Sequence, residues 1–123
     1  MMTSKRILIA DDSNTARGVL AKFFAQRDFD VCEAVDGEDT IEKARQLKPD
    51  LILLDVAMPH TNGIAAASVL KDMLPNVRIV LFTMYSEAVA RAFPREALPV
   101  DAVIAKGDGV SGLAECVQSL LRS

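Results

Sequence analysis

The sequence places five polar residues directly after short apolar runs, at the points where buried strands would end. Three are carboxylates, one is a hydroxyl and one is an ammonium group: Asp11, Asp12, Asp55, Thr83 and Lys106. Carboxylates that share a pocket repel each other by on the order of a kcal/mol per pair even at a surface-like dielectric, so three of them need a cation. Oxygen ligands that are partly open to water suit Mg²⁺ or Mn²⁺ and not zinc. Lys106 would add a fixed positive charge beside the metal.

Each of these residues alone has an ordinary structural explanation. An aspartate after a strand usually caps a turn or a helix. A threonine there usually satisfies a backbone group, and a lysine is usually solvated. Because the five residues follow four different strands and would meet at one edge of a sheet, these explanations do not account for them together. We therefore interpret them as one site.

The elements that must position this site alternate along the chain. Apolar runs at 6–10, 50–54, 78–82 and 100–105, with a weaker one at 29–34, predict strands buried on both faces. Helical patterns lie between them, at about 14–26, 36–47, 62–74, 86–93 and 110–121. Five strands alternating with five helices predict a doubly wound α/β fold, a (βα)₅ three-layer sandwich around a parallel five-stranded sheet. The flavodoxin-like order 2-1-3-4-5 is expected, with ligands bound where strands 1 and 3 diverge.

Two helices carry clear sequence signals. In the first, an apolar face is expected from Ala16, Val19, Leu20, Phe23 and Phe24, which follow the i, i+3, i+4, i+7, i+8 spacing. In the second, Asp36 is expected to cap the start, and Pro49 ends the pattern.

Composition limits the classes of function. The 123 residues allow one domain over 1–123, with 50% hydrophobic and 25% charged residues and a net charge of −3. No Lys/Arg cluster exceeds two neighbours, which argues against nucleic-acid binding by this domain. The first apolar stretch is too short for a signal peptide or a membrane span, so we expect no membrane partner and a cytoplasmic location. Cys32 and Cys116 are expected to be small buried hydrophobes, and His60 a surface loop residue.

The sequence resembles the receiver domain of bacterial response regulators over its whole length. The resemblance is carried by Ile7-Leu8-Ile9-Ala10-Asp11-Asp12-Ser13, by Leu51-Ile52-Leu53-Leu54-Asp55-Val56-Ala57-Met58-Pro59 followed by Gly63, by Leu81-Phe82-Thr83 and by Lys106.

The resemblance implies that Asp55 accepts a phosphoryl group from a phosphohistidine on a sensor histidine kinase or phosphotransfer protein. It implies that Asp12, Asp55 and the backbone carbonyl of Ala57 bind Mg²⁺, and that Asp11 holds the metal through water. Lys106 and Thr83 would contact the phosphoryl oxygens. Phosphoryl transfer depends mainly on positioning and charge neutralisation, so no general base is required. The domain would be a two-component switch that only phosphorylates and dephosphorylates itself, and not an enzyme acting on other substrates.

Two positions depart from the family pattern. Val103 stands where receivers usually carry Tyr or Phe, and Gly107 stands where many relatives have proline. The usual relay from threonine to an aromatic side chain is therefore in doubt. Tyr85 is offered as a substitute gate, with an exposed loop tyrosine as the plainer alternative.

Two other functions stay open at this point. A phosphatase of the haloacid-dehalogenase type needs a second acid two residues after its nucleophile, where this chain has Ala57. A receiver that serves only for docking would be supported by Val103 alone. The kinase, the stimulus, the effector or missing output domain and the oligomeric state are not encoded in any motif.

Overall fold

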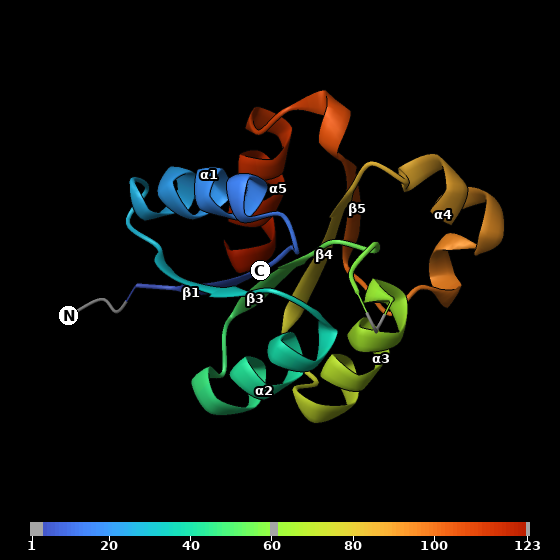
Figure 1. Cartoon of the computed structure of the whole chain (residues 1–123), viewed down its shortest axis with the longest axis horizontal. Helices are drawn as coiled ribbons and strands as arrows, with labels where there is room; N and C mark the ends of the chain where they lie inside the picture. The colour runs from blue at the N-terminus through green and yellow to red at the C-terminus, as the bar shows by residue number, and fades with distance from the viewer. Residues whose placement is uncertain (1–3, 60–61, 123) are drawn as a thin grey trace.

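Strands and helices alternate along the chain in the computed structural model, which describes residues 4–59 and 62–122 (Figure 1). His60, expected on a surface loop, lies outside the described residues. The strands are β1 (Arg6–Ala10), β2 (Asp30–Ala34), β3 (Leu51–Leu54), β4 (Arg78–Thr83) and β5 (Ala102–Ala105). The helices are α1 (Asn14–Ala25), α2 (Gly37–Leu47), α3 (Gly63–Met73), α4 (Ser86–Ala92) and α5 (Ser111–Arg122), with 3₁₀ turns at Arg95–Ala97 and Lys106–Asp108.

The five strands form one parallel sheet in the order β2-β1-β3-β4-β5, which confirms the predicted topology. The register aligns the carboxyl ends of the strands. Ala10 pairs with Leu54, Leu54 with Leu81, and Thr83 with Ala105. The residues that follow these positions therefore emerge along one edge of the sheet.

Helices cover both faces of the sheet. Figure 1 shows α1 and α5 on one side and α2 and α3 on the other, with α4 beside β5. Each face has its own apolar core, one centred on strand residues such as Leu8, Ile52 and Ile79 and the other on Ile9, Leu53 and Phe24. Because side chains of a strand alternate between faces, the central strands must be apolar throughout.

The prediction that all five strands are buried on both faces holds for the three central strands only. β1, β3 and β4 are almost entirely buried, but β2 is partly exposed and every residue of β5 is half-buried. Both are edge strands, with a neighbour on one side only. The prediction was wrong there because an apolar run does not reveal whether a strand is central.

Helix starts follow the expected capping chemistry. The carboxylate of Asp36 accepts a hydrogen bond from the backbone N–H of Asp39 at 2.8 Å, which confirms the predicted cap of α2. The side chains of Ser13 and Asn62 cap α1 and α3 in the same way, at 3.2 and 2.7 Å. These caps fix the points at which the chain leaves the loops at the carboxyl ends of β1 and β3.

The apolar face of α1 is rotated from the one predicted. Leu20 and Phe24 are buried, but Val19 is 58% exposed, so its assignment to the buried face was wrong. Successive helical residues are turned by about 100°, which places Val19 well away from Leu20 and places Arg17 on the same side as Leu20. A charged residue therefore occupies part of the inward-facing stripe.

Both cysteines are free thiols and are only partly buried. Burial raises the pKa of Cys32 and of Cys116, as expected for thiols in apolar surroundings. Within residues 4–59 and 62–122, none of the helices has the length and apolar character that crossing a bilayer requires.

Candidate functional site

Three carboxylates meet at the carboxyl ends of β1 and β3. Asp11, Asp12 and Asp55 each offer one oxygen such that these atoms all lie within 4.8 Å of one another. Asp11 and Asp55 are 3% and 7% exposed, whereas Asp12 is open to solvent. An oxygen-only cluster with one exposed member suits a hard cation that retains some of its water. The residues present therefore fit Mg²⁺.

The ammonium group of Lys106 places a positive charge beside the three carboxylates. Its ammonium nitrogen lies 2.7 Å from Oδ2 of Asp11 and 2.9 Å from Oδ2 of Asp55. Burial by itself lowers the pKa of a lysine, but the hydrogen bonds to Asp11 and Asp55 outweigh this effect, so the pKa of Lys106 is raised. The site thus has a permanent positive charge in contact with the expected phosphoacceptor.

The loop after β3 holds Asp55 tightly. Its backbone N–H donates to the carbonyl of Ala10 at 3.1 Å, and its Oδ1 accepts from the N–H of Ala57 at 3.2 Å. Gly63 then donates its N–H to the carbonyl of Val56 at 2.8 Å. A Cβ at Gly63 would collide with the backbone oxygen of Asp55 and lie 2.8 Å from Cα of Val56. The glycine is therefore required by the close approach of α3 to the site loop.

The loop after β1 is held by a residue that the sequence reasoning missed. The side chain of Arg17, on α1, donates from Nη1 to the backbone carbonyl of Asp11 at 2.8 Å. Asp11 also accepts at Oδ1 from the N–H of Ser13 at 2.9 Å. The only signal in the sequence is the helical spacing that puts Arg17 beside Leu20, and a search for apolar periodicity passes over an arginine.

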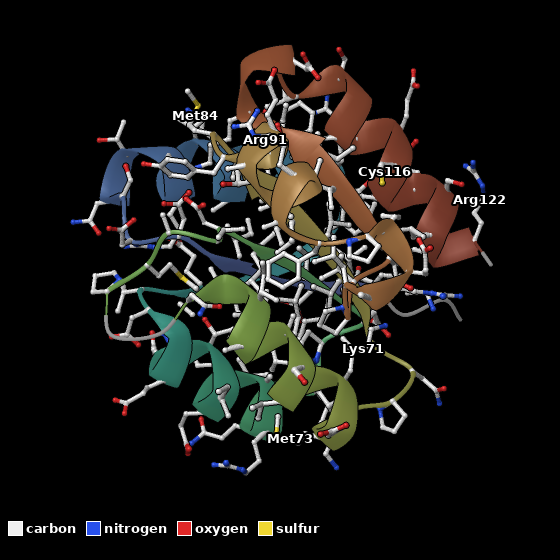
Figure 2. The ribbon with its side chains drawn as sticks, turned by 90° about the vertical axis from the view of Figure 1, so that its right-hand side faces the viewer. Lys71, Met73, Met84, Arg91, Cys116 and Arg122 are labelled. Carbon is white, nitrogen blue, oxygen red and sulfur yellow. The ribbon has the colours of Figure 1, made fainter. Side chains whose placement is uncertain are left out.

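Thr83 ends β4 next to the site and is fully buried. Its hydroxyl oxygen accepts a hydrogen bond from the N–H of Tyr85 at 3.1 Å, which ties it to the loop before α4. Tyr85 itself is exposed, in keeping with the plainer of its two expected roles. Thr83 lines a cavity of about 360 Å³ together with Met84, Arg91 and Gly107. Of these residues, Met84 and Arg91 are labelled in Figure 2, where their side chains lie near each other in the upper part of the view.

Val103 is half-buried on β5 and borders a separate, mainly apolar cavity. This cavity has a volume of about 210 Å³ and lies between α4 and β5, where Val89, Phe93 and Leu98 also line it. The short side chain of Val103 thus coincides with unfilled space.

Over most of its length, the chain matches a known protein family. The sequence profile described as "Response regulator receiver domain" matches residues 7–110. The response regulator protein VraR of Staphylococcus saprophyticus is 38% identical over 117 residues, which cover 92% of this chain and 54% of VraR. The chain thus spans about half the length of the curated relative that it matches.

Two solved structures of one protein resemble the fold closely. The response regulator TrrA of Thermotoga maritima, crystallised with Mg²⁺-BeF, has a TM-score of 0.85 and 27% identity, over 94% of this chain and 98% of TrrA. In a complex with the histidine kinase ThkA, the matched chain has a TM-score of 0.84 and 27% identity, over 95% of this chain and 98% of that one.

Proposed function

The chain belongs to the response regulator receiver family, and we propose that it is a phosphorylation switch whose acceptor is Asp55. Over residues 1–123 it would act as one receiver domain. The observation that carries the proposal is the pairing of Asp55 with Lys106 at 2.9 Å inside a cluster of three carboxylates. A carboxylate that only caps a helix does not need a lysine and two further carboxylates beside it. A carboxylate that accepts a charged phosphoryl group does need them, to bind the group and a metal ion.

In the proposed reaction, an oxygen of the Asp55 carboxylate attacks the phosphorus of a phosphohistidine. The new P–O bond forms as the P–N bond breaks, and the histidine nitrogen keeps the electron pair. Lys106, which contacts Asp55 in the free protein, would pair with the phosphoryl oxygens, and Thr83 would donate its hydroxyl hydrogen to them. Mg²⁺ held by Asp12, Asp55 and the carbonyl of Ala57, with Asp11 binding through water, would neutralise the charge that develops on these oxygens.

Phosphorylation of Asp55 would change the conformation of the loop that follows β4. Because Thr83 accepts from the N–H of Tyr85, movement of the Thr83 hydroxyl toward the phosphoryl group releases a contact at the start of α4. This is a local change of charge that biases a nearby element between two positions. It does not require an aromatic side chain at Val103.

The proposed partners are a sensor histidine kinase or phosphotransfer protein upstream and an effector or output domain downstream. The crystallised complex of TrrA with the kinase ThkA supports the first. The second is supported by relatives such as VraR, which are about twice as long as the segment they share with this chain. The exchange would take place in the cytoplasm, with no direct contact of this domain with nucleic acid.

The test is phosphorylation by acetyl phosphate in the presence of Mg²⁺, followed by intact mass. We expect one phosphoryl group on the wild type, none on Asp55→Asn, and normal labelling of Asp72→Asn, which removes an exposed carboxylate from α3. Chelation of Mg²⁺ should abolish labelling. Equal labelling of Asp55→Asn and the wild type would disprove the assignment of the acceptor.

Two further measurements on the wild-type protein distinguish the proposed switch from a phosphate-ester hydrolase and from a module that only docks. A hydrolase of small phosphate esters would show multiple turnover, which this site is not expected to support because Ala57 stands where the second acid is needed. A module that only docks would show no change in backbone amide resonances outside the site when beryllofluoride and Mg²⁺ are added. We expect changes that extend into α4.

A further inference from the structure

Arg17 makes three hydrogen bonds from a side chain that is only 11% exposed. Besides its 2.8 Å bond to the carbonyl of Asp11, it donates from Nη2 to the side-chain oxygen of Asn14 at 2.6 Å. Its Nε donates to the carboxylate of Glu33 on β2 at 3.0 Å. Each nitrogen of the guanidinium group is thus assigned to a different acceptor, so the group is held in one orientation.

The bond to Asp11 acts on the two acidic residues of the loop at once. The carbonyl of Asp11 belongs to the peptide unit that joins Asp11 to Asp12, and this unit is planar. At its other end, Asp11 donates its N–H to the carbonyl of Ala34 at 3.2 Å. Fixing both ends of Asp11 limits the directions in which the exposed side chain of Asp12 can leave the backbone. Asp12 is the one carboxylate of the cluster that is not buried, so it has the most freedom to lose when a cation binds.

The charge of Arg17 does not explain its place near the cluster. A guanidinium group close to a divalent cation repels it, but the charge of Arg17 is paired with Glu33. The remaining contribution is positional, because bonds that are already made in the free protein reduce the ordering that ligand binding requires.

We propose that Arg17 is a positioning residue for cation binding, which acts by holding the Asp11–Asp12 peptide unit in the orientation that the metal needs. This inference rests on the proposed function, since it concerns the same carboxylate cluster. It adds a residue on α1 whose effect should appear in the affinity for Mg²⁺ and not in the chemical step.

The experiment compares Arg17→Met with a matched control, Arg6→Met. Arg6 lies at the opposite end of β1 and also donates to a backbone carbonyl, that of Leu47 at 2.6 Å, and to a carboxylate, that of Asp30 at 2.8 Å. Both variants lose similar hydrogen bonds, but only Arg17 contacts the loop that carries Asp11 and Asp12. Mg²⁺ binding is measured by titration calorimetry on folded protein, with circular dichroism to confirm the fold.

We expect Arg17→Met to weaken Mg²⁺ binding by about 10-fold, the lower end of the range seen when groups that orient metal ligands are removed. Arg6→Met should bind Mg²⁺ as the wild type does. In phosphorylation by acetyl phosphate, the Mg²⁺ concentration for half-maximal rate should rise in Arg17→Met while the rate at saturating Mg²⁺ stays unchanged. If Arg17 had a merely structural role, Arg17→Met would lower the stability of the fold without raising the Mg²⁺ concentration for half-maximal rate. That outcome would overturn the inference.

Two further variants sharpen the result. Arg17→Lys keeps the charge but not the three fixed donors, so intermediate affinity is expected, and it replaces Arg17→Met if that variant does not fold. Glu33→Gln keeps the bond to Asp11 and should change Mg²⁺ affinity less than Arg17→Met does. If Glu33→Gln and Arg17→Met changed the Mg²⁺ affinity equally, the charge of Arg17 would matter and its bond to Asp11 would not. That result would also overturn the inference. Failure of the wild type to bind Mg²⁺ would instead disprove the proposed function.

Discussion

The ammonium nitrogen of Lys106 lies 2.9 Å from Oδ2 of Asp55, although 51 positions separate the two residues in the sequence. The same nitrogen contacts Asp11 at 2.7 Å, so one lysine bridges the carboxyl ends of β1 and β3 from the end of β5. A phosphoryl group on Asp55 would take over this lysine as its own partner. The contact is therefore both a stabilising ion pair and a part of the proposed reaction.

Replacement of Lys106 by methionine should slow phosphorylation by acetyl phosphate by about 100-fold, the scale typical of removing one group that stabilises developing charge. The rate is followed by intact mass at saturating Mg²⁺. The matched control is Lys71→Met, which breaks a comparable ion pair, 2.8 Å from Asp101, away from the site. Lys71→Met should be phosphorylated at the wild-type rate, and equal losses in the two variants would contradict the role given to Lys106.

Gly63→Ala should lower the free energy of unfolding by about 1–3 kcal/mol, since the new methyl group meets backbone that cannot easily move. It should also slow phosphorylation, because that backbone belongs to Asp55 and Val56. Gly18→Ala is the control. A Cβ at Gly18, within α1, meets nothing within 4 Å, so the change should stabilise the protein by up to about 1 kcal/mol. Urea denaturation and the labelling rate of both variants test this pair.

Asp101 gives a prediction about pH. Burial raises the pKa of this carboxyl group, but hydrogen bonds from Lys71 and from the N–H of Ile79, with the charges of Lys71 and Arg78, outweigh it, so the pKa of Asp101 is lowered in the folded protein. A lowered pKa stabilises the fold above the unfolded value near 3.8, and this stabilisation disappears as the pH falls through the folded value. Asp101→Asn should therefore cost about 2 kcal/mol at pH 7, a typical value for hydrogen bonds to a charged group.

The difference in unfolding free energy between the wild type and Asp101→Asn should shrink steadily below about pH 4. Urea denaturation at a series of pH values measures it. A difference that stays constant from pH 7 into the acid range would mean that the charge of Asp101 contributes nothing.

Val103→Phe should raise the melting temperature or leave it unchanged, because the added ring can enter the cavity of about 210 Å³ beside α4. Val80→Phe is the contrasting variant. Val80 is fully buried on β4, and the same enlargement there should cost about 1–3 kcal/mol. Thermal denaturation followed by circular dichroism compares the two, and a loss at position 103 as large as that at position 80 would mean that the cavity cannot accept a ring.

Much of this architecture was predictable because it depends on patterns of a single residue property. Apolar runs and caps such as Asp36 identified the elements and their order, and the ends of parallel strands indicated which polar residues would meet. Besides the exposure of the edge strands β2 and β5, two details of α1 were not visible in this way. Val19 was assigned to the buried face of α1 and is exposed, and Arg17, on the inward side, was not considered. Both errors have one cause, which is that apolar periodicity ignores a charged residue whose partners come from other elements.

The adjacency of β1 and β3 also has a consequence for how the protein folds. Each parallel pairing joins segments far apart in the chain, so loop-closure entropy must be overcome before the contacts form. The acidic residues lie on the first half of the chain, whereas the lysine that neutralises them follows β5, the last strand of the sheet to be synthesised. A chain emerging from the ribosome would therefore carry the Asp55 carboxylate without its lysine partner until β5 has docked, so that the proposed phosphorylation of Asp55 would itself report that the sheet is complete.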